Sequence, residues 1–162
     1  LDFPISGPEK ALLESLGATF VTIRRKGQLR GCIGSLKAHR SLLEDLRHNC
    51  LAAAFKDSRF PPIQPEELTE LSLEVSLLSA PQELVASDQA TALQIIRPGI
   101  DGLILREGHH QATFLPQVWN EIPDPLEFLR RLRLKAGLPA NHWSPETRLQ
   151  RYQVQKWAET DT

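Results

Sequence analysis

The stretch that decides the fold is ATFVTIRRKGQLRGCIGSL, residues 18–36. Residues 18–24 are rich in β-branched and aromatic side chains, which favour a β-strand. The triplet at 25–27, RKG, is a polar turn, and residues 28–36 can return as the paired strand. The stretch therefore predicts an antiparallel hairpin at the start of a β-sheet.

Helix and strand signals continue on both sides of this hairpin. Capping boxes at 6–9 and 41–44 mark helix starts, and the apolar/polar alternation of 71–77 is typical of a half-buried strand. The expected order is a helix from 6 to a stop at Gly17, strands 18–24 and 28–36, a helix 41–57, helical turns at 65–71, a strand 71–77, a helix 87–96, a hairpin of 99–106 with 111–115, a helix 124–135 and a closing strand 149–157. Strands joined by tight turns favour antiparallel pairing, so the predicted fold class is α+β.

Length and composition predict one globular domain spanning 1–162, because 41% of its residues are hydrophobic and 24% charged. A formal net charge of −1 provides no basic field that would draw nucleic acid or anionic lipid. No apolar run approaches the roughly 20 residues of a bilayer span, and no secretory leader is seen. Two cysteines form no disulfide framework, which predicts a reducing, cytoplasmic location. The lack of any methionine predicts a leading segment before Leu1.

The motif Leu29-Arg30-Gly31-Cys32-Ile33-Gly34, followed by Ser35, is the first candidate site. Glycines inside a strand mark a bulge or a close approach to the backbone. On a regular strand Arg30, Cys32 and Gly34 share a face, so a guanidinium beside the thiol would favour the thiolate. The same cation with exposed backbone N–H groups would hold a carboxylate or phosphate. The alternative is a buried cysteine that packs as a small hydrophobe.

The segment Asp57-Ser58-Arg59-Phe60-Pro61-Pro62 is the second candidate site. Its proline pair stiffens the chain after a helix. Asp57 is expected to accept backbone N–H groups or to pair with Arg59, and Arg59 to reach an anionic ligand. The alternative is a loop that ends the helix with a solvated salt bridge, which contributes little to stability.

Histidine and cysteine spacing does not predict a metal site. His109 and His110 are adjacent, so on a strand they point to opposite faces, and no His-x-x-x-His, Cys-x-x-Cys or Glu-x-x-His spacing is present. His110 is nevertheless a candidate base for Cys32, since the partner of a thiol need only be near in space. Cys50 lies on the apolar face of its helix and is expected in the core.

The motif resembles the hallmark of the AMMECR-one domain family. FVT at 20–22 precedes the motif, and further matching segments follow it in order, so that the match spans about Phe20 to Tyr152: KDSRFPP at 56–62, EEL at 66–68, VSLL at 75–78, GL at 102–103, ATFLPQVW at 112–119 and KAGL at 135–138. The run HHQ at 109–111 is similar to the bacterial branch, called protein A of the AmmeMemoRadiSam system. This resemblance identifies the chain as a member of the family.

The resemblance implies a fold in which a mainly antiparallel sheet is flanked by helices, with a smaller lobe packed beside it and a further helix before the present start. It implies Memo-type and radical S-adenosylmethionine proteins as partners in a shared pathway, and it names neither a reaction nor a cofactor. The family motif carries over to Arg30, Gly31, Cys32 and Gly34 and to Asp57, Ser58, Arg59, Phe60 and Pro61.

Two functions follow as hypotheses. The first is a binding or adaptor component whose ligand contacts come from Gly31, Gly34, Ser35, Asp57, Ser58, Arg59 and Phe60. The alternative is a thiol-dependent enzyme in which Cys32 is nucleophile or redox group, Arg30 or Arg59 binds a small anionic substrate and His110 is the base. Nucleic-acid binding is the least favoured, given the charge and the low aromatic content.

Overall fold

The computed structural model describes residues 5–159 and divides the chain into two compact units. The first unit runs to Leu78 and resumes at Gln155, and the second is Ser79–Val154. The first unit is built from α1 (Gly7–Glu14), β1 (Leu16–Arg25), β2 (Gln28–Gly34), β3 (Arg40–Ser41), α2 (Leu42–Phe55), the 3-10 helix η1 (Pro65–Glu70), β4 (Leu71–Leu78) and β9 (Val154–Ala158). The second contains β5 (Gln82–Leu84), α3 (Gln89–Ile95), β6 (Gly102–Glu107), β7 (His110–Phe114), the 3-10 helix η2 (Pro116–Asn120), α4 (Pro125–Lys135) and β8 (Arg148–Tyr152).

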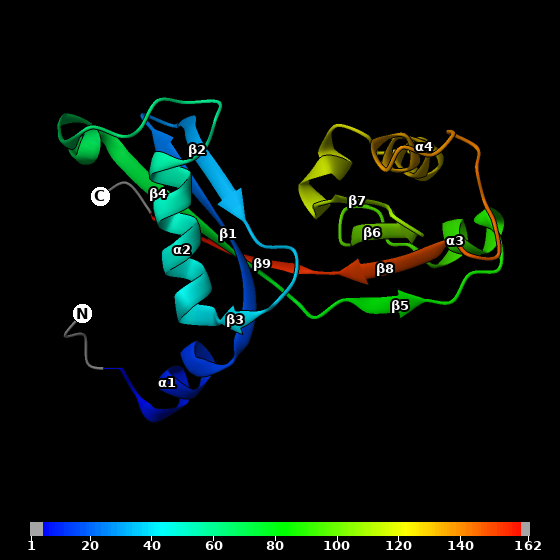
Figure 1. Cartoon of the computed structure of the whole chain (residues 1–162), viewed down its shortest axis with the longest axis horizontal. Helices are drawn as coiled ribbons and strands as arrows, with labels where there is room; N and C mark the ends of the chain where they lie inside the picture. Colours follow the sequence, from blue (N-terminus) through cyan, green and yellow to red (C-terminus); the bar gives the residue numbers. More distant parts are fainter. Residues whose placement is uncertain (1–4, 160–162) are drawn as a thin grey trace. The chain divides into compact units, whose positions relative to one another are not determined.

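The first unit is an antiparallel sheet with the strand order β2-β1-β4-β9, and β3 pairs with the start of β1. The predicted hairpin of β1 and β2 is confirmed. Its two loop residues, Lys26 (φ 50°) and Gly27 (φ 79°), are both left-handed, as a tight hairpin turn requires. Helix α2 lies along one face of this sheet (Figure 1) and packs on β1 and β2.

Helix α2 begins as its sequence predicts, because Ser41 and Glu44 form a reciprocal capping box. The sequence predicts an apolar buried face for this helix, but the observed buried face also carries polar residues. Asp45 and Asn49 lie on that face, 0% and 1% exposed, together with apolar residues. Polar groups are tolerated there because each finds hydrogen-bond partners on β1.

The Asp45 carboxylate connects three segments of the first unit. Its Oδ2 accepts hydrogen bonds from the backbone N–H and hydroxyl of Thr19, both at 2.8 Å, and from Asn49 Nδ2 at 3.0 Å. Its Oδ1 accepts from the Ser35 hydroxyl at 2.6 Å and lies 3.1 Å from Arg40 Nε. Helix α2 is thereby joined to β1 and to the residue that follows β2.

Gly31 allows β2 to approach α2 more closely than any other residue would. A Cβ at this position would overlap the backbone carbonyl oxygen of Ala53 in α2. Gly34 is restricted in the same way by the ring of Phe20. The expectation of a close approach to these glycines is met, and the approaching groups belong to the protein itself.

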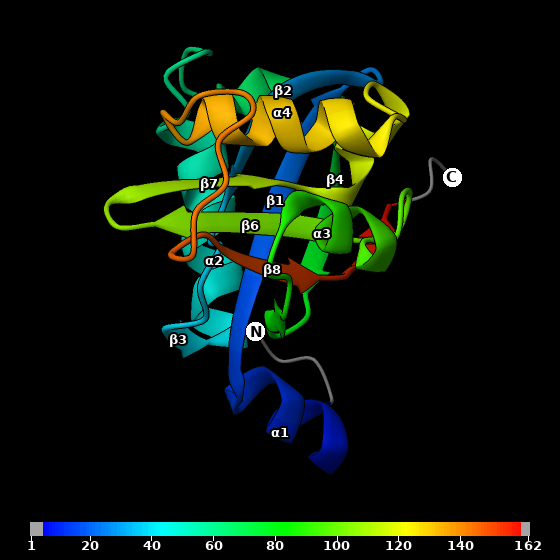
Figure 2. The ribbon, with the colours of Figure 1, turned by 90° about the vertical axis from the view of Figure 1, so that its right-hand side faces the viewer.

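The second unit is an antiparallel sheet with the strand order β5-β8-β6-β7. One face packs on α4, as Figure 2 shows, and the core there includes Leu103, Leu105 and Phe128, each 0% exposed. Trp119 stacks on Phe128 with ring centroids 3.7 Å apart. Helix α4 begins at its predicted cap, Asp124, and ends before Gly137, whose φ is 84°.

Two expectations about the elements were wrong in detail, and two short strands were not expected. The expected closing strand 149–157 is two strands in different sheets, β8 and β9. The break lies at Gln153, whose N–H donates to Ser79 Oγ and whose carbonyl accepts from Ser79 N, both at 2.8 Å. Gly17 is part of β1 and does not end the preceding helix, and the short strands β3 and β5 carried no recognisable alternation. Among residues 5–159, no helix combines the length and apolar character needed to cross a bilayer.

We expect Gly31→Ala to lower the free energy of unfolding by about 2 kcal/mol or more, because a backbone carbonyl cannot move aside for the new methyl group. Urea denaturation measures the effect. Gly7→Ala is the matched control, because nothing lies within 4 Å of its Cβ position and the change should stay below about 1 kcal/mol. Equal stability of the two variants would show that β2 does not rest on α2 in this way.

Candidate functional site

Cys32 lies in β2 opposite Thr22 of β1, and its side chain is half-buried. Its Sγ is 3.2 Å from the Thr22 hydroxyl oxygen. Its backbone N–H donates to Asp57 Oδ2 at 2.9 Å. The N–H that was expected to be available to a ligand is therefore used inside the protein.

Asp57 and Arg59 form a clamp on the backbone of Cys32. The Asp57 carboxylate, with 4% of its side chain exposed, accepts from Arg59 Nη2 at 2.7 Å, from Arg59 Nε at 3.0 Å and from Arg59 N at 3.1 Å. Arg59 Nη2 also donates to the Cys32 carbonyl at 3.3 Å. The Arg59 guanidinium holds the pKa of Asp57 well below its usual range, and the Cys32 N–H bond lowers it further.

The loop of residues 57–60 continues from the buried Asp57 carboxylate to the protein surface. Phe60 N donates to the Asp57 carbonyl at 3.1 Å, and Arg59 Cζ lies 5.5 Å from the centroid of the Phe60 ring, within cation–π range. Ser58 is exposed. The Arg59 side chain is 55% exposed, so one edge of its guanidinium faces solvent while the other is held by Asp57.

Arg30 is engaged away from the Cys32 thiol, contrary to the expectation of a cation beside it. Its Nε and Nη2 donate to the two carboxylate oxygens of Glu67 at 2.8 and 2.9 Å, and its Nη1 donates to the Pro61 carbonyl at 2.9 Å. This bidentate pair is largely buried, with side chains 11% and 10% exposed. The Arg30 guanidinium lowers the pKa of Glu67 to about 2, with help from the Gln64 N–H.

The remaining motif residues support the strand. The Ser35 hydroxyl donates a hydrogen bond to Asp45. Gly31 packs against Ala53, and Gly34 packs against Phe20. The structure therefore brings Cys32, Asp57 and Arg59 together, and it assigns Ser35 and the two glycines to packing and hydrogen bonding within the unit.

His110 lies in β7 of the second unit, and its Nδ1 is 2.9 Å from the carbonyl oxygen of Ala136. That nitrogen is the donor, because a carbonyl oxygen only accepts. A role for His110 as a base toward Cys32 stays a prediction. Within residues 5–159, no group of three or more His, Cys, Asp and Glu side chains is placed to hold a metal ion.

Sequence reasoning missed a polar row on the sheet face that carries Cys32. Thr22 pairs with Cys32 on one side and with Glu74 of β4 on the other, so the three share one face. Glu74 Oε1 accepts from Arg24 Nε at 2.7 Å, and its Oε2 lies 2.8 Å from Lys156 Nζ. Both cations lower the pKa of Glu74. Alternating polar residues on β1 and β4 were the available signal.

Comparison with known proteins agrees with the fold and with the family that the sequence resembles. The sequence profile of the AMMECR1 family matches residues 4–157. A protein of Methanothermobacter thermautotrophicus is 44% identical over 138 residues, which cover 84% of this chain and 72% of that protein. A protein of Nanoarchaeum equitans is 37% identical over 98% of this chain and 89% of its own length. The crystal structure of the uncharacterized protein PH0010 from Pyrococcus horikoshii superposes with a TM-score of 0.81 at 31% identity, over 98% of this chain and 81% of that chain.

We expect stability to fall as the pH is lowered from about 5 to about 2, because Asp57 and Glu67 have lower pKa values in the folded chain than the roughly 4 of an unfolded one. The stabilisation from each is complete above its unfolded pKa and is lost as the pH falls through its folded pKa. Denaturation curves at pH 7, 5 and 3 measure this loss.

Glu67→Gln should lower the free energy of unfolding at pH 7 and reduce its decline toward pH 3, because the group that titrates is gone. The matched control is Glu66→Gln, at the exposed neighbouring position. If the wild type and Glu67→Gln lost stability in parallel on acidification, the Arg30–Glu67 pair would carry no pH-dependent stabilisation.

Proposed function

Because this chain belongs to the AMMECR1 family, we propose that it acts as a binding or adaptor component that recognises an anionic group of its ligand or partner beside Cys32. The single observation that carries this proposal is the state of Arg59. Its guanidinium is held by a buried carboxylate on one edge, while the side chain as a whole is 55% exposed. A cation held in place before binding loses little conformational freedom when a ligand arrives.

The hydrogen-bond inventory of Arg59 supports this role. Its Nε and Nη2 are used by Asp57 and by the Cys32 carbonyl, whereas its Nη1 donates to no residue in the described range 5–159. The planar guanidinium therefore presents Nη1 toward solvent, with the Phe60 ring beside it. Such an edge can donate to a carboxylate or phosphate oxygen of a partner.

The chemistry around the thiol favours binding over catalysis. A general base works best with a pKa near the operating pH, but the pKa of Asp57 is held far below its usual range and its oxygens already accept four hydrogen bonds. The Thr22 hydroxyl, which contacts the Cys32 thiol, is no base at neutral pH. A thiol-dependent enzyme with Cys32 as nucleophile or redox group is the alternative, and it would need His110 or a ligand to take the proton.

For partners we propose a Memo-type protein and a radical S-adenosylmethionine protein of a shared cytoplasmic pathway. This part of the proposal rests on the resemblance of residues 109–111 to the bacterial branch. The ligand chemistry it requires is an exposed acidic side chain or a phosphorylated group that Arg59 can contact.

Titration calorimetry with each of these two proteins, taken from the organism that encodes this chain, tests the proposal. Arg59→Ala should weaken binding about tenfold or more, because it removes a charge-assisted hydrogen bond worth about 1.5–3 kcal/mol. Cys32→Ser should change the affinity less than about twofold, since a hydroxyl retains the contact with Thr22.

The matched control is Arg131→Ala, which removes an exposed arginine of α4 that pairs with Glu127. Its affinity should equal that of the wild type. Loss of binding in Cys32→Ser with unchanged folding, or equal affinities of the Arg59 and Arg131 variants, would refute the proposed role of Arg59.

A further inference from the structure

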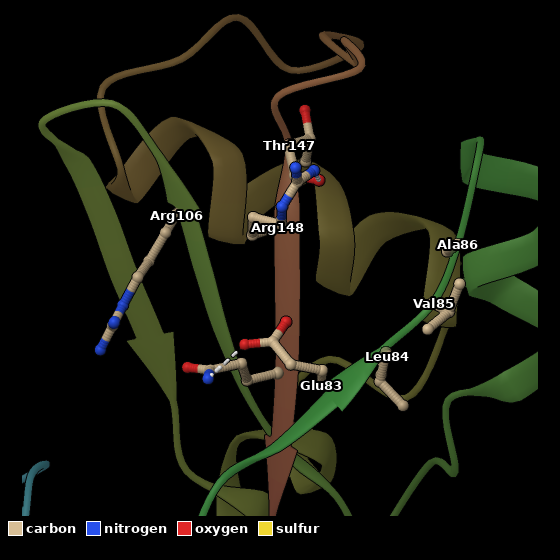
Figure 3. Close-up of a pocket in the computed structure, with 8 residues that line it drawn as sticks. Glu83, Leu84, Val85, Ala86, Arg106, Thr147 and Arg148 are labelled. Atoms are coloured by element: carbon tan, nitrogen blue, oxygen red, sulfur yellow. Dashed lines mark hydrogen bonds between the residues drawn. The ribbon is translucent and has the colours of Figure 1, made fainter.

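A pocket outside the candidate site lies in the second unit, beside β5 and β8. The pocket there has a volume of about 500 Å³, within the range of small-molecule sites. One wall is the chain from Glu83 to Ala86, and the rest is formed by residues of β6 and β8 and by Thr147. Figure 3 shows Arg106 on one side of the pocket, Arg148 near its centre, and Leu84, Val85 and Ala86 along the opposite side.

Arg106 and Arg148 occupy directly opposed positions of β6 and β8. Two like charges across a strand pair destabilise a sheet unless a counterion separates them. In the described chain, no carboxylate oxygen lies within 4.0 Å of a nitrogen of either side chain. Figure 3 shows the two side chains pointing apart, as uncompensated like charges do.

Both side chains also keep unused donors. Arg106 Nε is buried and has no hydrogen-bond partner among the described residues. Arg148 donates from Nη1 to the carbonyls of Pro145 and Thr147, at 2.9 and 3.4 Å. Its Nε and Nη2 donate to no residue within 5–159. A buried donor without an acceptor costs free energy, so the Arg106 side chain gains if it turns its guanidinium toward an anionic ligand.

We propose that this pocket binds a small organic anion, a carboxylate or a phosphate ester, and that the side chains of Arg106 and Arg148, which point apart without it, turn toward its charged group. The side chains of Leu84 and Val85 provide an apolar wall for the body of the ligand. Val85 is 90% exposed without one, so its coverage by an apolar group would be favourable. This site is independent of Arg59, since it lies entirely within the second unit.

Glu83 places one negative charge in the lining of the pocket. Its Oε1 accepts from Gln150 Nε2 at 2.6 Å, so the carboxylate stands at the pocket without an arginine partner and opposes an anion. With two arginines and one glutamate, the ionisable lining carries a net charge of +1. Neutralising Glu83 should therefore strengthen anion binding, whereas neutralising either arginine should weaken it.

Titration calorimetry on the full chain with phenyl phosphate, benzoate and the neutral benzyl alcohol tests the proposal. At least one anion should bind about tenfold or more tightly than benzyl alcohol, and the tighter of the two identifies the acid group. Arg106→Gln and Arg148→Gln should each weaken it about tenfold, and Glu83→Gln should tighten it about threefold. Arg131→Gln, on α4, is the matched control and should leave the affinity unchanged.

Thermal unfolding without ligand gives a second, independent measurement. Arg148→Gln should raise the Tm, because it removes a like-charge pair, and phenyl phosphate or benzoate at constant ionic strength should raise the Tm of the wild type. Binding of benzyl alcohol as tight as that of both anions, no binding of either anion, or equal affinities of the arginine variants and the wild type would each overturn the proposal. Arg59→Ala should leave this binding intact, so the two proposals can fail separately.

Discussion

The contact between Gly31 and the carbonyl oxygen of Ala53 sets the arrangement of the first unit, because it places strand β2 directly on the backbone of helix α2. Adjacent strand residues point to opposite faces, so Gly31 against the helix directs Cys32 to the other face of the sheet. There the thiol lies beside Thr22 and in the same polar row as Glu74. Because Gly31 has no side chain and lies against α2, Cys32 lies on the opposite face of the sheet.

Buried carboxylates then hold the segments around β2 in place. Asp45 joins α2 to β1 and to Ser35, Asp57 holds the Cys32 backbone and Arg59, and Glu67 holds Arg30. A buried carboxylate is costly unless donors satisfy it, so each of these groups specifies its neighbours strictly. The candidate site is therefore held by several hydrogen bonds, and its Arg59 side chain remains 55% exposed.

Local patterns in the sequence were sufficient for most of the fold. The turn at Lys26 and Gly27, the cap at Ser41 and the cap at Asp124 are interactions between near neighbours, and all three are present. The class, α+β with antiparallel sheets flanked by helices, follows from them and is confirmed. The polar face of α2 was missed, although the i, i+4 spacing of Asp45 and Asn49 before two buried alanines was a usable signal. The division of the segment after Thr147 into two strands left no local trace, because it depends on a pairing with Ser79.

By itself the sequence determined the family, the hairpin and the segments that meet at Cys32, because motifs and turns depend on residues close together in the chain. Only the tertiary structure decided which charges pair. Arg30 lies two positions from Cys32 yet binds Glu67, which is 37 residues away, whereas Arg59, 27 residues from Cys32, reaches its carbonyl. The opposed arginines Arg106 and Arg148 likewise become neighbours only when β6 and β8 pair. Long, flexible side chains choose partners by distance in space, and that distance is set by packing between elements rather than by sequence spacing.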